Sequence, residues 1–180
     1  MKKISIVALL SAFVATPALA DNTGKMYIAG DLGAATYSNM SPFPNPDVIR
    51  FAVGSHFSPN LAAEVGYSVF GDSTITSPGG SATVSASAFQ IAAIGSLPLN
   101  PQFDLIGKLG FSHNSAKGGG LAAGISTSNN SVLFGVGAQY HLNSQFSLRA
   151  QYENYGKFEN SSNSNPMGAT AISLGVVYNF

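Results

Sequence analysis

The residues that could carry chemistry are few in this sequence. Of its 180 residues only 9% are charged, 8 basic and 8 acidic, and there are 3 histidines and no cysteine. The lack of cysteine excludes disulfides, thiolate metal sites and cysteine nucleophiles. The triplet His113-Asn114-Ser115 could suggest a His–Ser hydrolase, but no acidic residue occurs from 116 to 130. Because a base without an orienting third group is poor evidence for catalysis, we expect no enzyme.

The same residues do not indicate a site for nucleic acid, a metal ion or a cofactor. The formal net charge of zero argues against a nucleic-acid partner, which would require a basic patch. The spacing of His56 and His141 suggests no metal site, and we expect no cofactor. Soluble domains carry roughly 25% charged residues. A surface with so few charges would be poorly hydrated, which indicates that something other than water faces part of this protein.

The elements that must position the charged residues are strands. Beyond residue 20, apolar and polar residues alternate with period two in segments that turn-forming residues separate. No run of 18 apolar residues occurs there, and helical spacing is poor. The predicted strands, eight in number, are 25–37, 47–57, 61–70, 84–97, 103–113, 131–142, 146–155 and 169–180.

The connections between these strands are alternately short and long. The short ones, at 58–60, 98–102 and 143–145, consist of residues that favour tight turns. The long ones are rich in Ser, Asn, Gly and Pro, and they span 38–46, 71–83, 114–130 and 156–168. This order predicts an antiparallel up-and-down arrangement with short turns at one end and four long loops at the other.

The two faces of each predicted strand differ in character. One face carries Phe, Leu, Ile, Val and Tyr, while the other carries small residues and every charge that falls firmly inside a strand. Those charged residues are Asp31, Arg50, Glu64, Asp104, Lys108, Arg149 and Glu153, and Gln90, Gln139 and Gln151 share their face. Because burial of an unpaired ion costs several kcal/mol, we expect these residues to form one interior polar network.

Two arrangements satisfy this alternation. In a soluble barrel or sandwich the bulky face would form the core, whereas in a membrane barrel that face would contact lipid. Side-chain volume favours the membrane barrel, because eight bulky faces would overfill the narrow interior of an eight-stranded barrel. The prediction is therefore an all-β fold, an eight-stranded antiparallel transmembrane up-and-down β-barrel with short periplasmic turns and four long extracellular loops.

The first twenty residues read as a cleaved signal peptide. Lys2 and Lys3 form the basic region, 4–14 form a short apolar region, and Ala18-Leu19-Ala20 provides a small-residue cleavage site. The apolar run is shorter than the roughly 20 residues that a membrane-spanning helix needs, which disfavours an N-terminal anchor. We expect a signal peptide at 1–20, a barrel domain at 21–180, and export to the outer membrane of a Gram-negative bacterium.

Short motifs in order along 25–180 support a family resemblance. They include Gly30-Asp31-Leu32-Gly33, Ala62-Ala63-Glu64-Val65-Gly66-Tyr67, Lys108-Leu109-Gly110, Arg149-Ala150-Gln151-Tyr152, Tyr155-Gly156-Lys157 and the ending Leu174-Gly175-Val176-Val177-Tyr178-Asn179-Phe180. The chain resembles the small eight-stranded outer-membrane proteins, among them the membrane domain of outer-membrane protein A and the neisserial surface protein A and opacity group. The resemblance implies that Tyr178 and Phe180 form the signal read by the barrel-assembly machinery.

The resemblance also bears on conduction. Glu64 and Arg149 correspond to the ion pair of a gated pore in the outer-membrane protein A group. The second base expected on the fourth strand is Ile94 here, and the acid expected on the sixth is Gln139, so the switch is incomplete. The resembling lipid A deacylases carry a His-x-Ser-Asn motif on their next-to-last strand, whereas the triplet here follows the fifth.

Three hypotheses for function follow. The favoured one is a structural or surface-interaction barrel of adhesin-like type, whose interior charges satisfy one another. The alternatives are a narrow ion or small-solute pore and a lipid-modifying enzyme. The expected partners are outer-membrane lipid and lipopolysaccharide, the barrel-assembly machinery, and a host or phage ligand on the loops 38–46, 71–83, 114–130 and 156–168.

Overall fold

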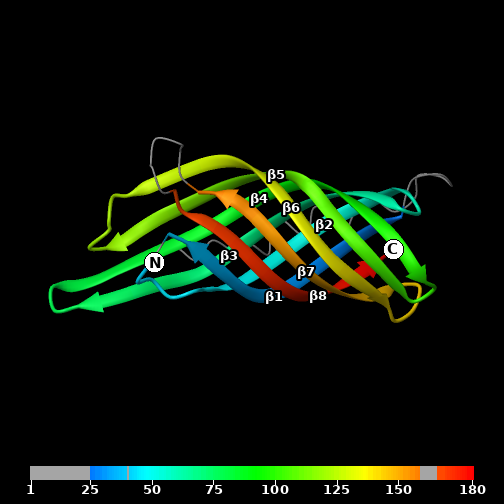
Figure 1. Ribbon diagram of the computed structural model, residues 1–180, viewed down its shortest axis with the longest axis horizontal. Coiled ribbons are helices and arrows are strands. Elements are labelled where there is room, and N and C mark those ends of the chain that lie inside the picture. The colour runs from blue at the N-terminus through cyan, green and yellow to red at the C-terminus, as the bar shows by residue number, and fades with distance from the viewer. Residues whose placement is uncertain (1–24, 40, 159–165) are drawn as a thin grey trace.

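The computed structural model describes residues 25–39, 41–158 and 166–180. They form eight strands: β1 (Met26–Ser38), β2 (Asp47–Ser58), β3 (Leu61–Ser77), β4 (Gly80–Asn100), β5 (Phe103–Gly120), β6 (Ser126–His141), β7 (Phe146–Lys157) and β8 (Gly168–Asn179). Each strand pairs with its sequence neighbours, and β8 pairs with β1, so the sheet is a closed barrel (Figure 1). The predicted fold class is confirmed.

Closure depends on the pairing of the first and last strands. The antiparallel register of β1 and β8 runs from Tyr27 opposite Asn179 to Ser38 opposite Gly168. A closed sheet pairs the backbone groups that an open sheet would leave exposed along its two edges. This matters in hydrocarbon, where each unsatisfied backbone group costs several kcal/mol.

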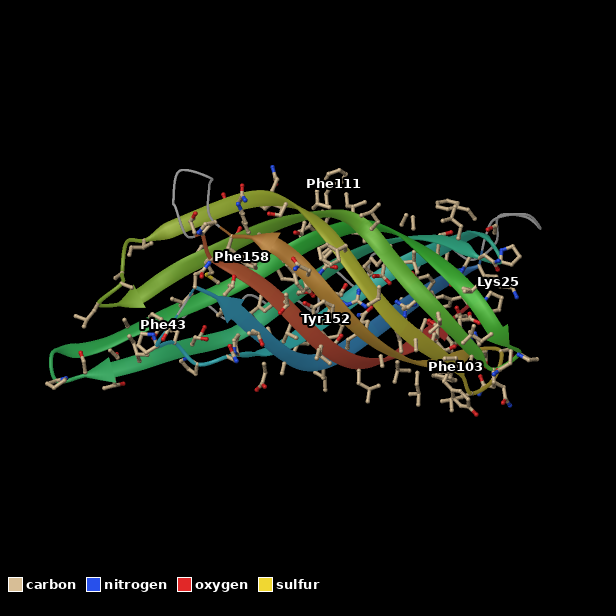
Figure 2. The ribbon with its side chains drawn as sticks, in the orientation of Figure 1. Lys25, Phe43, Phe103, Phe111, Tyr152 and Phe158 are labelled. Atoms are coloured by element: carbon tan, nitrogen blue, oxygen red, sulfur yellow. The ribbon has the colours of Figure 1, made fainter. Side chains whose placement is uncertain are left out.

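The two ends of the barrel differ in their connections. At the end where Lys25 and Phe103 lie, the strands are joined by the short segments 59–60, 101–102 and 142–145 (Figure 2). These agree with the predicted turns. Phe43 and Phe158 lie at the opposite end, where the connections were expected to be long loops.

The strands at that opposite end are longer than predicted. Most of 71–83 and 114–130 is strand, because β3 continues to Ser77 and β5 continues to Gly120 before turning. The Thr and Ile residues of these segments suit strands. The segments pair with their neighbours from Thr74 opposite Thr83 to Lys117 opposite Ser126. Residues 71–77, 80–87, 113–120 and 126–131 thus form a four-stranded sheet extension beyond the barrel (Figure 1).

The large apolar side chains face outward, as the alternation predicts. Phe111 points away from the barrel (Figure 2) and is 70% exposed, and Tyr152 is exposed as well. Other outward residues include Leu32, Phe51, Val65, Ile91, Leu109, Phe134, Val136, Ile172 and Leu174. None of the described residues belongs to a helix long and apolar enough to cross a membrane. The predicted signal peptide, 1–20, lies outside the described residues.

Candidate functional site

Glu64 of β3 lies at the centre of the barrel interior. Its Oε1 atom accepts from Arg50 Nη1 at 2.6 Å and from Lys108 Nζ at 2.7 Å. Its Oε2 atom accepts from Arg149 Nη1 at 2.8 Å and from the Tyr27 hydroxyl at 3.0 Å. The Glu64 side chain is only 2% exposed. One carboxylate therefore holds three cations that come from β2, β5 and β7.

Two further acids complete the charge balance. Lys108 Nζ also contacts Glu153 Oε1 at 2.7 Å, and Arg50 Nη2 contacts Asp31 Oδ2 at 2.8 Å. A longer contact of 3.6 Å joins Arg50 Nε to Glu153 Oε2. The buried set, named here the ionic core, contains three acids and three bases: Asp31, Glu64, Glu153, Arg50, Lys108 and Arg149. Its net charge is zero, which is the condition for burying ions without an uncompensated charge.

Neutral polar side chains fill the remaining positions around the ionic core. Gln139 accepts from Arg149 Nε at 3.0 Å. Gln151, with its amide oxygen toward Arg50, accepts from Nη2 at 2.6 Å. Gln90 donates to Ser68, whose hydroxyl contacts Tyr155. The structure thus brings together nine of the ten residues that the alternation placed inside.

The missing member is Asp104. Its carboxylate does not reach the ionic core, because it lies near the turn end of β5, opposite Pro98. There Asp104 Oδ2 contacts His141 Nε2 at 3.1 Å, and His141 Nδ1 contacts Ser147 Oγ at 2.9 Å. The Ser147 residue is fully buried. This Asp–His–Ser contact chain therefore lies at the turn end, outside the ionic core.

Two inward glycines make room for the large interior side chains. A Cβ atom at Gly175 of β8 would lie 2.4 Å from Asp31 Oδ1, and one at Gly54 of β2 would lie 2.1 Å from the Tyr27 ring. Only glycine leaves that space, because every other residue carries a Cβ. The small residues of the inward face are therefore a packing requirement of the charged and aromatic ones.

Aromatic side chains fill the barrel on the side of the sheet extension. Tyr37, Phe70, Tyr155 and Phe158 form this aromatic layer. The Phe70 ring centroid lies 5.2 Å from Tyr155 and 5.7 Å from Phe158, both in edge-to-face contacts. All four residues are buried. Tyr155 joins the layer to the ionic core, since its hydroxyl donates to Glu153 Oε2 at 3.0 Å.

The turn end of the interior is closed by a smaller cluster. Tyr27 packs there with Ile94, Ile106 and Val177. Arg149 lies over the Tyr27 ring at 5.4 Å from its centroid, a cation–π contact. The interior therefore has three layers, with the ionic core between two apolar ones.

The strand register shows which residues lie beside the two positions that differ from the gated-pore pattern, Ile94 and Gln139. Ile94, where the resemblance expects a base, lies opposite Lys108 of the next strand. Lys108 provides the third cation of the core, and it contacts Glu64 and Glu153 together. Gln139, where an acid was expected, binds Arg149 instead. The third cation of this core thus comes from β5, on the strand next to Ile94.

Aromatic residues of the last strand form a separate outward cluster. The Tyr178 ring centroid lies 5.0 Å from Phe146 and 5.1 Å from Phe180. Phe180 is 62% exposed, and its backbone N–H donates to the Met26 carbonyl. Tyr178 and Phe180 therefore lie side by side on the outer surface at the turn end, where an interfacial aromatic girdle is expected.

Comparison with known proteins identifies the family. The family model described as "Outer membrane protein beta-barrel domain" matches residues 5–180. This chain belongs to the outer-membrane β-barrel family. Among curated proteins, none matches the sequence. No group of three or more potential metal ligands occurs among the described residues.

Solved outer-membrane barrels have the same fold at low sequence identity. Neisserial surface protein A is 19% identical with a TM-score of 0.66, over 86% of this chain and 97% of that one. Ail of Yersinia pestis, crystallised with the heparin analogue sucrose octasulfate, is 17% identical with a TM-score of 0.62, over 87% and 99%. The N-terminal barrel of Pseudomonas aeruginosa OprF is 13% identical with a TM-score of 0.60, over 88% and 99%. At these identities the likeness establishes the fold alone.

Proposed function

We propose that this outer-membrane barrel has a structural or surface-interaction role, and that its interior is a self-satisfied plug and not a conducting path. The observation that carries the proposal is the coordination of Glu64. Its two oxygens accept from three cations and one phenol. A carboxylate that already binds all three bases of the core has no alternative cation to which it could switch.

Opening a path would therefore require net loss of contacts. Removing one partner from a buried ion pair leaves an uncompensated charge, which costs about 3–5 kcal/mol. The aromatic layer lies beyond the ionic core and would have to move as well. Wide channels of the diffusion type have about 16 strands, twice the number here.

Planar-bilayer recording tests this proposal. Purified refolded protein is expected to give no discrete conductance steps. The Glu64→Ala and Arg149→Ala variants probe the ion pair, and Ser87→Ala, a change outside the barrel interior, is the control. Discrete steps in the unaltered protein that disappear in both interior variants would contradict the proposal and support the narrow pore.

We assign the surface role to the end of the barrel that carries the sheet extension. The described part of that end carries two lysines, Lys117 and Lys157, and two acids, Asp47 and Asp72. Sulfated glycans require clustered basic residues, and this balance does not favour them. We therefore propose a host or phage ligand of low charge. Calorimetry with sucrose octasulfate is expected to show no saturable heat, and saturable binding would contradict the low-charge assignment.

Assembly follows from the outward cluster of Phe146, Tyr178 and Phe180. We propose that Tyr178 and Phe180 are read by the barrel-assembly machinery after removal of residues 1–20. The Tyr178→Ser and Phe180→Ser double variant is expected to lower the amount of folded barrel in cells. Refolding of the same variant in detergent should change little, because neither side chain contributes to the interior. Equal loss in both settings would point to a purely structural effect.

A further inference from the structure

A cavity lies at the turn end of the barrel, on the side away from the sheet extension. Its volume is about 730 Å³, and residues of all three short turns line it together with Lys25 and Asn179. The buried apolar cluster that contains Tyr27 separates this cavity from the ionic core. Pockets that bind small ligands have volumes of about 300–1,000 Å³. The turn-end cavity is thus large enough for a ligand and is closed at its inner end.

The ionisable side chains that line this cavity are basic. Lys25 is exposed at this end of the barrel (Figure 2), and it forms no ion pair with another described residue. His56 and His141 line the cavity as well, whereas no acidic residue of the described chain does. Asp104 is close by, but its carboxylate contacts His141 Nε2 at 3.1 Å and its side chain is only 16% exposed. The uncompensated charge in the cavity is therefore positive.

Hydrogen-bond donors lie beside these basic groups. Gln102 and Ser144 line the cavity, and neither side chain bonds to another described residue. The Asn143 Oδ1 atom accepts the backbone N–H groups of Gln145 and Phe146, which leaves the Asn143 amide nitrogen available to donate. Amide nitrogens and hydroxyls can donate to the oxygens of a carboxylate. The polar part of the cavity therefore fits an anion.

Apolar side chains border the same cavity. Phe57 is 71% exposed and Leu142 is 55% exposed, and Pro59 and Pro101 lie with them in the lining. Burial of apolar surface stabilises a complex in proportion to the area removed from water. A small inorganic anion offers no such surface. The best fit is a ligand that carries a carboxylate and an apolar group side by side, as the last residue of a peptide does.

We propose that the turn-end cavity binds the carboxyl-terminal end of a periplasmic peptide. Bacterial outer-membrane barrels have their short turns on the periplasmic side. The terminal carboxylate of the peptide contacts Lys25 and the neighbouring amide donors, while its apolar last side chain packs against Phe57 and Leu142. This periplasmic role goes beyond the proposed surface role, which belongs to the opposite end of the barrel.

Fluorescence of a short peptide tests the proposal. The protein contains no tryptophan, so the peptide Trp-Glu-Ala-Leu with a free carboxyl terminus reports its own binding to the refolded chain 21–180 in phosphatidylcholine nanodiscs. Saturable binding is expected, and Lys25→Glu should weaken it about tenfold through loss of a charged contact. Lys117→Glu makes the same charge change at the opposite end and should leave the affinity unchanged. Absence of saturable binding, or equal weakening by both variants, would overturn the proposal.

Matched peptides and competitors test which ligand the cavity takes. The amidated peptide and the peptide that ends in serine should each bind several-fold more weakly than Trp-Glu-Ala-Leu, and equal affinities would overturn the carboxyl-terminal assignment. Displacement of the peptide by an equal concentration of inorganic phosphate, or by phosphatidylglycerol in the nanodisc, would overturn the peptide assignment in favour of a simple anion or a lipid headgroup.

The chain itself contains one competing acid, Asp21, which lies outside the described residues. The Asp21→Asn variant should bind the peptide with unchanged affinity, and tighter binding would assign the cavity to the protein's own N-terminal segment instead. Heat-modifiable gel migration checks that each variant is folded. A folded barrel that binds no peptide refutes this inference alone, because the proposed surface role does not depend on the turn end.

Discussion

The middle of the barrel and its extended end are filled by different means. In the ionic core, each charged group is held by partners from other strands, such as Arg149 of β7 on Glu64 of β3. In the aromatic layer, rings such as Phe70 and Phe158 pack by shape alone. The ionic core is stable only when every partner is present, since one missing partner leaves an unpaired buried ion. The aromatic layer depends on volume, which tolerates gradual change.

The largest effect is expected for Glu64→Ala. This change leaves Arg50, Lys108 and Arg149 facing two acids, and an uncompensated buried charge costs about 3–5 kcal/mol. Urea unfolding in lipid vesicles measures the loss of free energy. The Glu64→Gln and Lys108→Met double variant restores two acids and two bases, and it should recover part of the loss. If the Glu64→Ala variant were as stable as the unaltered protein, the ionic core would not depend on complete pairing, and its difference from the aromatic layer would disappear.

Gly175→Ala is expected to have the next largest effect. The added Cβ would lie 2.4 Å from Asp31 Oδ1 and 2.4 Å from the Gly30 carbonyl oxygen, so both the carboxylate that binds Arg50 and the β1 backbone must shift. Overpacking of this kind costs about 1–3 kcal/mol. The same unfolding measurement applies, with Gly95→Ala as control, because nothing lies within 4 Å of a Cβ at Gly95. Equal stability of the two variants would show that the core shifts freely.

Phe158→Leu tests whether the aromatic layer tolerates a change of side-chain shape. The substitution keeps an apolar side chain of similar volume in the aromatic layer, and such changes cost less than about 1.5 kcal/mol. The edge-to-face contact with Phe70 is lost, while the hydrogen bond between Tyr155 and Glu153 remains. A loss as large as that of Glu64→Ala would mean that the layer, too, requires one exact filling.

The smallest effect is expected for Asp104→Asn. Its partner His141 is 31% exposed at the turn end, where solvent screens the pair. Exposed pairs contribute about 0–1 kcal/mol, so unfolding should shift little. A large loss at Asp104 would extend the ionic core to the turn end.

Sequence alternation predicts the fold and most of the site for a simple physical reason. A closed barrel offers each strand residue one of two sides, so a period of two assigns Glu64, Lys108 and Glu153 inward without any tertiary information. The same alternation, continued to the last residues of the predicted strands 25–37 and 61–70, places Tyr37 and Phe70 inside as well. Alternation tells whether a side chain faces inward or outward, but not its position along the barrel axis. For this reason Asp104 was grouped with a network that it does not reach.

Other features depend on three-dimensional proximity. Phe158 and Met167 lie in a connection without periodicity, where the Phe158 backbone N–H donates to the Met167 carbonyl and both residues are buried in one cluster with Phe70. The sheet extension was missed because Ser, Gly and Asn resemble loop composition, whereas cross-strand pairing of four neighbouring segments makes them strands. The position of Lys108 beside Ile94 also requires the register, since the two residues are neighbours only across β4 and β5.

The contributions to the ionic core are spread around the barrel. Acids and bases come from β1, β2, β3, β5 and β7, and Gln90 and Gln139 add β4 and β6. A sheet with only some of its strands paired would therefore expose unpaired charged side chains to the acyl chains. Their desolvation cost is offset by ion pairs only when the barrel closes. Half-inserted intermediates should for that reason be poorly populated, and membrane insertion should proceed as a single cooperative transition.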